Sequence, residues 1–257
     1  MSDKRKTANK TANKGQELIY GVHAVEKFIK QSPHLIYVLT VIKGKLNARQ
    51  QALVDAAKAA GLAVQFEPKS FFNKLEGNHQ GVAAQVAHRP DLTEKALPDI
   101  LAQADQPLFL FLDEVQDPHN LGAILRTADA VGVDAVIIPK HNSVGVNATV
   151  RKVASGAAET VKLVVVNNLV RTLETLKKEG MWMIGLAGET QQTIYQMDYQ
   201  GAVGIVMGAE GTGLRKLTRE ACDHLAAIPM VGSVESLNVS VATGVVLYEA
   251  FRQRTQK

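Results

Sequence analysis

The stretch LFLFLDEVQDPHNLGAILRTADAVGVDAVII (Leu108–Ile138) holds two apolar runs with a helical segment between them. Leu108–Asp113 and Asp134–Ile138 have the length and composition of strands, and Asn120–Val131 has its apolar residues at helical spacing. Strands that are apolar throughout are typical of a parallel sheet whose two faces are covered by helices. This stretch therefore predicts an α/β fold built on a parallel sheet.

The same alternation of strands and helices continues as far as Arg252. It predicts strands over Val161–Val166, Met181–Ala187, Ala202–Gly208 and His224–Met230, and helices over Asn147–Ala158, Leu169–Glu179, Gly213–Cys222 and Asn238–Arg252. In open parallel sheets, ligands bind beyond the carboxyl ends of the strands. We therefore expect the functional site in the loops that follow these strands.

A smaller α/β body is predicted before this sheet. Its expected helices lie over Leu18–Ile29, Asn47–Ala60 and Lys69–Leu75, and its expected strands over Leu35–Ile42, Ala63–Glu67 and Gly81–Ala87. Residues 89–106 carry two prolines and four acids among few large apolar side chains, which is typical of a linker that contains one helical turn. The predicted division is a tail over 1–16, a first domain over 17–88, a linker over 89–106 and a second domain over 107–257.

The composition excludes several classes of protein. No apolar run is long enough for a transmembrane helix, and no signal-peptide core is present, so we expect a cytoplasmic protein without membrane contact. Cys222 is the single cysteine, which rules out a disulfide within the chain and a cysteine-rich zinc site. The histidines show no metal-binding spacing either, so no metal is expected.

The positive charge lies mostly in the first residues. Residues 1–16 hold five of the 29 bases and one of the 25 acids, so the remainder carries 24 of each. This segment is polar and contains TANK twice, which predicts disorder. Two interpretations stay open, a solubilising leader and a loose arm that binds phosphates.

Asn120–Arg126, with the pattern N-x-G-x-x-x-R, is the first loop and helix that could carry chemistry. Arg126 is predicted opposite the apolar stripe of the helix, among the small residues Gly122, Ala123 and Ala130. Small residues around one guanidinium suggest the close approach of a ligand or of another subunit. The simpler interpretations are a helix cap for Asn120 and a solvated charge for Arg126.

Met207–Gly213 (MGAEGTG) and Ile228–Gly244 (IPMVGSVESLNVSVATG) are the other candidate segments. The first places Glu210 in a glycine-rich turn that fits neither a P-loop nor a dinucleotide-binding fingerprint. The basic residues after it, Arg215, Lys216 and Arg219, are a solvated face or an RNA contact. In the second, Ser236 and Asn238 precede an apolar helix, as caps do, and Asn147 and Ser155 of a fourth segment have ordinary cap and packing interpretations.

These three motifs, in this order and at this spacing, resemble those of the SpoU/TrmH branch of the SPOUT RNA methyltransferases. The resemblance covers Asp113 to Arg252. The first body looks like the ribosomal-protein-like substrate-binding domain of family members that methylate a guanosine of 23S rRNA. The family therefore supplies expectations about fold, chemistry and assembly that the residue pattern alone does not give.

The resemblance implies transfer of a methyl group from S-adenosylmethionine to a ribose 2′-oxygen of a guanosine in 23S rRNA. It implies a trefoil knot in the second domain and a homodimer with the site at the subunit interface. The 2′-hydroxyl distinguishes RNA from DNA, so DNA is not an expected substrate. The implied cofactor-binding residues are Gly208, Ile228 and Leu237, and the implied catalytic residues are Arg126, Asn120, Glu210, Ser236 and Asn238.

Two other functions stay open at this point. A relative that methylates tRNA would carry the same motifs, although the first body favours rRNA because it offers a second RNA-binding surface. A non-catalytic RNA-binding assembly protein could keep the fold, although Asn120, Arg126, Glu210 and Asn238 are all present. A nucleotide-binding oxidoreductase is excluded by the missing glycine fingerprint.

Overall fold

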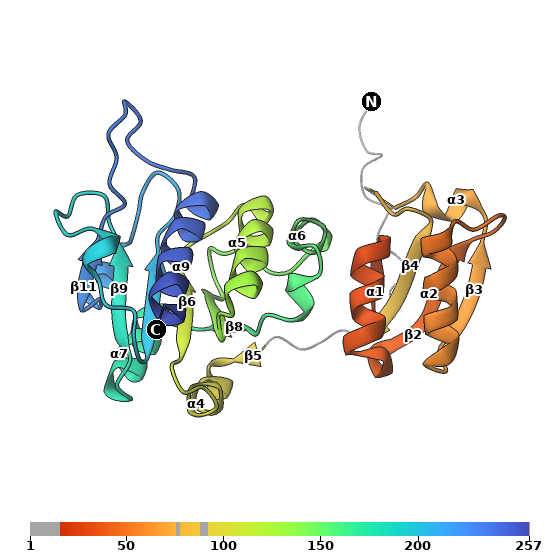
Figure 1. Cartoon of the computed structure of the whole chain (residues 1–257), viewed down its shortest axis with the longest axis horizontal. Coiled ribbons are helices and arrows are strands. Elements are labelled where there is room, and N and C mark those ends of the chain that lie inside the picture. Colours follow the sequence, from red (N-terminus) through yellow and green to blue (C-terminus); the bar gives the residue numbers. More distant parts are fainter. Residues whose placement is uncertain (1–15, 76–77, 88–91, 257) are drawn as a thin grey trace, which may run out of the picture. The chain divides into compact units, whose positions relative to one another are not determined.

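The computed structural model describes residues 16–75, 78–87 and 92–256, and it divides the chain into two compact units, Met1–Pro90 and Asp91–Lys257 (Figure 1). The tail predicted over 1–16 lies outside the described residues apart from Gln16.

The first unit is a four-stranded sheet covered on one face by helices. Its strand order is β1-β4-β2-β3, with β4 antiparallel to β1 and β2, and β2 parallel to β3. Apolar side chains of the sheet pack with those of the two longer helices, including Val25, Phe28, Leu39 and Leu53. The elements are β1 (Gln16–Tyr20), α1 (Val22–Gln31), η1 (Pro33–Leu35), β2 (Ile36–Ile42), α2 (Ala48–Ala59), β3 (Ala63–Glu67), α3 (Lys69–Phe72) and β4 (Val82–Ala87).

The helix predicted over Leu18–Ile29 is wrong in its first part. Leu18 pairs with Gln85 as part of β1, and α1 begins only after Gly21, whose φ of 99° is unfavourable for other residues. The strand was missed because its partner β4 lies far away in the sequence, where local spacing carries no information about pairing.

The second unit is a seven-stranded sheet in which all neighbouring strands are parallel, as predicted. Its order is β11-β9-β10-β6-β7-β8-β5. The strands are β5 (Leu92–Thr93), β6 (Leu108–Leu112), β7 (Ala135–Pro139), β8 (Leu163–Val166), β9 (Trp182–Leu186), β10 (Val203–Met207) and β11 (His224–Ala226). The helices are η2 (Glu94–Ala96), α4 (Leu97–Ala102), α5 (Pro118–Val131), α6 (Ala148–Ala154), η3 (Ala157–Glu159), α7 (Leu169–Lys178), η4 (Ile194–Gln196), α8 (Lys216–Glu220) and α9 (Val239–Thr255).

Helices cover both faces of this sheet. Side chains alternate along each strand, so each apolar strand sends side chains to both faces. On β6, Leu108, Leu110 and Leu112 pack in a cluster with residues of α5, α6 and α9, which Figure 1 shows on one face. Phe109 and Phe111 pack in a second cluster with α4 and α7 on the other face. The strands are therefore apolar at successive positions because both of their faces are buried.

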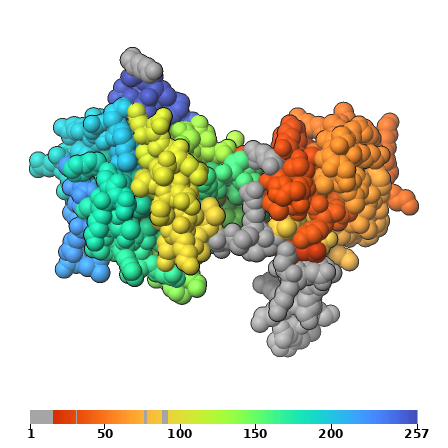
Figure 2. Space-filling view, turned by 90° about the horizontal axis from the view of Figure 1, so that it is seen from below, coloured from red at the N-terminus to blue at the C-terminus, as the bar shows by residue number. Residues whose placement is uncertain are grey.

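The structure differs from the linker predicted over 89–106. Leu92 pairs with Val164 at the edge of the sheet, and Leu97 and Ile100 of α4 are buried against Phe109. Figure 2 shows this segment, in yellow, lying along the body of the second unit. Two buried side chains in a polar, proline-containing segment give too weak a pattern to be recognised from sequence.

The carboxyl ends of the strands in the second unit lead into the loops expected to carry function. These loops follow β6, β7, β10 and β11. The trefoil knot stays a prediction, since strand order and register do not state how a chain passes through its own loops. Within the described residues, every helix is too short or too polar for a transmembrane span.

Candidate active site

Asn120 lies in the first turn of α5 and does not cap it. The cap is Asp117, whose Oδ1 accepts a hydrogen bond from the His119 backbone N–H at 2.8 Å. The interpretation of Asn120 as a cap is therefore wrong. Asn120 is buried, with 8% of the residue exposed, so its amide needs partners inside the protein. Asn147, in contrast, is confirmed as the cap of α6.

Those partners come from the other two motifs. Nδ2 of Asn120 donates to Oε2 of Glu210 at 3.2 Å, and Nδ2 of Asn238 donates to Oδ1 of Asn120 at 3.0 Å. Nδ2 of Asn238 is also 3.4 Å from Oε2 of Glu210. Three segments separated by many residues thus bring two amides and one carboxylate into contact at the carboxyl edge of the sheet.

Asn238 is also the cap of α9. Its Oδ1 accepts from the backbone N–H of Ser240 at 3.0 Å and from the Ser240 hydroxyl at 2.6 Å. These two donors fix the amide so that its Nδ2 faces Asn120 and Glu210. The cap interpretation and the functional one are therefore both compatible with the geometry, and Ser240 is a positioning residue that the sequence did not indicate.

The glycine-rich turn needs glycine for steric reasons. A Cβ on Gly208 would lie 2.1 Å from the carbonyl carbon of Gly213, so no side chain fits there. Ala209 and Gly213 exchange two backbone hydrogen bonds of 3.0 and 3.1 Å, and Gly211 and Gly213 have φ of 84° and 67°. The turn folds back on itself and holds Glu210 within it.

Arg215 anchors this turn to the end of β6. Its Nε donates to Oδ1 of the buried Asp113 at 2.8 Å, its Nη2 lies 2.6 Å from the same oxygen, and its Nη1 lies 3.1 Å from Glu114. The hydrogen bond with Asp113 raises the pKa of the Arg215 guanidinium. Among the basic residues expected as a solvated face or an RNA contact, Arg215 thus forms an ion pair within the second unit. Sequence patterns gave no signal for its partner.

Arg126 lies apart from the polar cluster. It is exposed on α5, six positions after Asn120, and makes no hydrogen bond or ion pair with any residue that the structure describes. Six residues of helix span about 9 Å along the axis. The close approach of a ligand or a second subunit is not needed to explain Gly122. A Cβ there would lie 2.7 Å from Cβ of Val153 in α6. Gly122 allows packing of α5 on α6 within this chain.

The expected cofactor-binding residues lie after the two strands that flank β9. Gly208 follows β10 and Ile228 follows β11, and both are half-buried. Leu237 is half-buried directly before Asn238. Ser236 is exposed, and its hydroxyl forms no hydrogen bond with the described part of the chain, so the geometry does not join it to the cluster.

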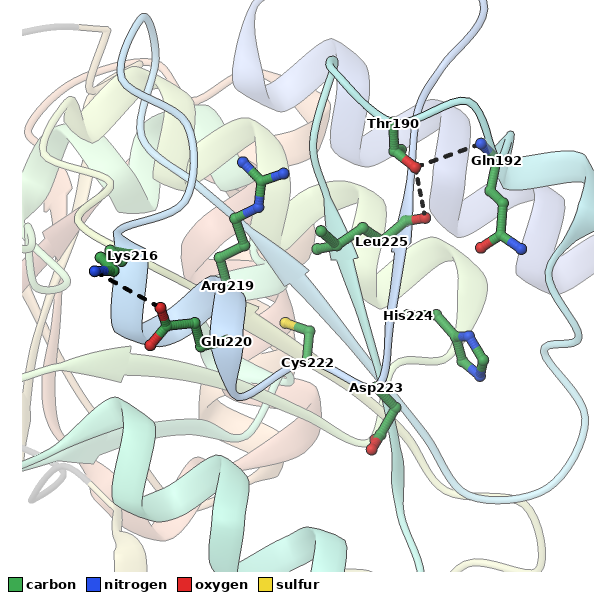
Figure 3. Close-up of a pocket in the computed structure, with 9 residues that line it drawn as sticks. All are labelled: Thr190, Gln192, Lys216, Arg219, Glu220, Cys222, Asp223, His224 and Leu225. Atoms are coloured by element: carbon green, nitrogen blue, oxygen red, sulfur yellow. Dashed lines mark hydrogen bonds and ion pairs between the residues drawn. The ribbon is translucent and has the colours of Figure 1, made fainter.

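A pocket elsewhere in the second unit contains none of the expected site residues. It lies beside α8 and β11 (Figure 3). Most of its charges pair within the unit: Lys216 with Glu220, and Asp223 with Lys177. Burial raises the pKa of the Cys222 thiol to about 12, so it is a poor nucleophile. We therefore place the candidate chemistry at the Asn120–Glu210–Asn238 cluster.

Comparison with known proteins finds matches for both units of the chain. The model of the SpoU rRNA Methylase family matches residues 107–248, and the model described as RNA 2′-O ribose methyltransferase substrate binding matches residues 18–91. The chain is 49% identical over 241 residues to the 23S rRNA (guanosine-2′-O-)-methyltransferase RlmB of Escherichia coli, covering 93% of this chain and 99% of that one. The Shewanella oneidensis protein of the same name is 51% identical over 243 residues, covering 94% and 99%.

Among solved structures, the chain is similar to the SpoU methyltransferase AviRb from Streptomyces viridochromogenes in complex with the cofactor AdoMet. The TM-score is 0.79 at 23% identity, with 97% of this chain and 94% of that chain covered. At this identity the likeness concerns the fold alone. It includes both units, so the small α/β body and the parallel-sheet domain occur together in a known architecture.

Proposed function

Because the chain belongs to the SpoU rRNA Methylase family, we propose that it methylates the ribose 2′-oxygen of a guanosine in 23S rRNA, with S-adenosylmethionine as methyl donor. The observation that carries this proposal is the contact among Asn120, Glu210 and Asn238, which joins the three family motifs in one polar cluster. The curated relatives match the chain over both units, which favours their substrate.

The residues present fit the cofactor. Gly208 must lack a side chain for the turn after β10 to close, and Ile228 and Leu237 supply half-buried apolar side chains at the same edge of the sheet. Apolar contacts beside a few polar groups are what a site for a small cofactor requires. We assign cofactor binding to these three residues. When bound, the cofactor supplies an electrophilic methyl group.

The protein must make a ribose hydroxyl nucleophilic. A 2′-hydroxyl attacks poorly until its proton leaves, so a cation close to the oxygen assists by stabilising the developing negative charge. Arg126 is exposed and free of internal partners, so its guanidinium is available to RNA. Arginine does not lose its proton in proteins, so we assign Arg126 to charge stabilisation and phosphate positioning rather than to the role of base.

The polar cluster has the chemistry to orient the ribose. Glu210 is an exposed carboxylate held by amide donors from Asn120 and Asn238, and it keeps acceptor capacity for a ribose hydroxyl. Asn120 is buried and holds the other two side chains in place. We assign Asn120, Glu210 and Asn238 to orientation of the ribose and of one another, and we keep Ser236 as an RNA-facing hydroxyl of the same loop.

We further propose a homodimer formed through α9 and the neighbouring part of α5. Val241, Tyr248 and Phe251 of α9 are 52%, 54% and 38% exposed, which leaves an apolar stripe along the helix. Gly244, between them, lies against Thr127 of α5, the residue after Arg126. A second copy on this stripe would bring another chain next to Arg126. An isolated apolar stripe of this kind is a common feature of an interface.

The oligomeric state tests the homodimer directly. A Tyr248→Glu/Phe251→Glu double variant should sediment as a monomer and lose methyl transfer, whereas Leu217→Glu, on the exposed surface of α8, should keep the dimer. A double variant that sediments as a dimer contradicts the assignment. An enzyme that acts on 23S rRNA works where ribosomes are made, so we place it in the cytoplasm.

The substrate is tested with labelled S-adenosylmethionine and either 23S rRNA fragments or tRNA, followed by mapping of the product. We expect label on a guanosine ribose of the 23S fragments. Label on a base, or on tRNA only, would overturn the substrate. Absence of transfer to any RNA, with the cofactor bound, would favour a non-catalytic assembly protein.

A further inference from the structure

The loop between β7 and α6 opens a stretch of the second unit that contains basic residues but no acid. Residues 140–158 contain four basic residues, of which three are lysine or arginine and one is His141, and no acid. Arg151 is engaged in an ion pair with Glu159 and is shielded from solvent. The other three bases are exposed: Lys140, His141 and Lys152.

The loop is held in one conformation on both flanks. The backbone N–H of Lys140 donates to Val166 at 2.8 Å, and that of Val144 donates to Val115 at 3.0 Å. Asn142 Nδ2 donates to Oε1 of Glu114 at 3.0 Å. Lys140 and His141 are therefore presented by a fixed backbone, which lowers the entropy lost when they bind a ligand.

The two residues joined by this hydrogen bond, Asn142 and Glu114, have unusual backbone angles. Asn142 and Glu114 both lie in the left-handed region, with φ of 58° and 65°, and neither is glycine. Such conformations cost free energy and persist where surrounding contacts impose them, often at functional sites. The side chains of these two residues hydrogen-bond each other, so the loop after β6 and the loop after β7 are fixed together.

Glu114, the acid that accepts from Asn142 of this loop, and its neighbour Asp113 are both paired with a base. Glu114 contacts Nη1 of Arg215 at 3.1 Å, and the buried Asp113 contacts Arg215 at 2.6 Å. The side chains of Lys140 and His141 form no ion pair or hydrogen bond with other residues in the described ranges. Their donors thus face solvent without an internal acceptor, as a surface for an anion requires.

The loop also lies at the edge that carries the candidate active site. β7 pairs with β6 in parallel, so their carboxyl ends meet at one edge, about 5 Å apart. The segment after β6 leads directly into α5, which bears Asn120 and Arg126. An RNA strand whose ribose reaches Asn120 therefore passes close to the loop after β7.

We propose that Lys140 and His141 bind phosphates of the RNA strand next to the target nucleotide and so fix its register in the site. This inference rests on the proposed function. It adds a contact with RNA made by residues that belong neither to the three family motifs nor to the polar cluster. Lys140 supplies a point charge and His141 a ring N–H, both suited to phosphate oxygens.

The test is a Lys140→Ala/His141→Ala double variant with Lys162→Ala as matched control. Lys162 is an exposed lysine directly before β8, at the opposite edge of the same sheet. RNA binding is measured against salt concentration, together with kcat and KM for methyl transfer and equilibrium binding of S-adenosylmethionine. Thermal unfolding shows whether each variant is folded; if the double variant is not, Lys140→Gln replaces it.

We expect the double variant to raise KM for RNA about tenfold at moderate salt, with kcat and cofactor binding unchanged. The slope of log affinity against log salt should fall by about 0.7, for the one phosphate of a single strand that Lys140 neutralises. Lys162→Ala should match the wild type. Equal slopes in wild type and double variant, or an equal loss in the control, overturn the proposal. If the wild-type protein binds RNA but methylates none, the proposed function fails, and the salt slopes still decide this inference.

Discussion

Nδ2 of Asn238 donates a hydrogen bond to Oδ1 of Asn120 across 3.0 Å, although 118 positions separate the two residues. The hydroxyl of Ser240 donates a hydrogen bond to Oδ1 of Asn238 and fixes its side chain, and Asn120 is buried in the first turn of α5. The amide of Asn120 is therefore oriented by its acceptor oxygen, and its Nδ2 is directed at Glu210. A chain of oriented amides that ends on a carboxylate is sensitive to any change of donor into acceptor.

Asn120→Asp tests this orientation with almost no change in size. The substitution replaces the Nδ2 donor by an oxygen beside Glu210, so two carboxyl groups face each other where one hydrogen bond was. We expect kcat to fall about 100-fold, as for loss of one oriented donor in other active sites. Single-turnover methylation of an RNA substrate measures it.

Asn168→Asp is the matched control for this change. Asn168 caps α7 through Oδ1, and aspartate caps a helix equally well, so activity should stay at the wild-type level. Wild-type activity of Asn120→Asp would show that the hydrogen bond to Glu210 does not matter for catalysis.

Gly208→Ala should destroy the turn that holds Glu210. A Cβ would meet the backbone of Gly213 at 2.1 Å, and backbone cannot move aside as a flexible side chain can. We expect loss of measurable methyl transfer and weaker cofactor binding, monitored by calorimetry. Gly145→Ala is the control, because a Cβ there meets nothing within 4 Å, and its cofactor binding should be unchanged. Tight cofactor binding by Gly208→Ala would remove this turn from the binding site.

The sheet could be predicted from sequence because its strands are buried on both faces. β6 and β10 are apolar at every position, so no knowledge of distant partners was needed to recognise them. β1 and the packing of α4 were missed for the opposite reason: Leu18 and Leu97 contribute to a sheet and a core whose other members lie far along the chain.

The candidate site was predictable only in part. The residue types in the three motifs indicated chemistry, but only the family resemblance indicated that they act together, since contacts across 90 and 118 positions have no local pattern. The local sequence favours Asn120 as the cap of α5. Asn and Asp are equally suited to that role, so the residue types could not show that Asp117 is the actual cap. The Asp113–Arg215 ion pair had no signal at all, because either residue alone reads as surface charge.

Glu249 makes stability depend on pH in the acid range. The hydrogen bond from Arg252 lowers the pKa of this carboxyl below its ordinary value of 4.5, against the opposing effect of burial. A carboxyl with a lowered pKa in the folded state stabilises the fold above its unfolded pKa, and this contribution is lost as the pH falls through the folded pKa. The free energy of unfolding should thus decrease below about pH 4.5.

Glu249→Gln isolates this contribution. The variant should be less stable than the wild type at pH 7, and the difference should shrink as the pH falls from 4.5 towards 3, as measured by urea unfolding at each pH. A difference that stays constant over this range would show that the ion pair with Arg252 does not contribute.

Arg126 separates catalysis from stability more clearly than any other candidate residue. Its side chain is exposed and makes no hydrogen bond or ion pair with a described residue, so Arg126→Ala should leave the midpoint of thermal unfolding unchanged. The same variant should reduce kcat by at least 100-fold if the guanidinium stabilises the ribose oxyanion. Arg126→Lys keeps the charge without the planar fork and should recover only part of the rate, because one ammonium cannot contact phosphate and ribose in the same geometry. Near-normal turnover by Arg126→Ala would exclude the residue from the mechanism, and full recovery by lysine would reduce its role to charge alone.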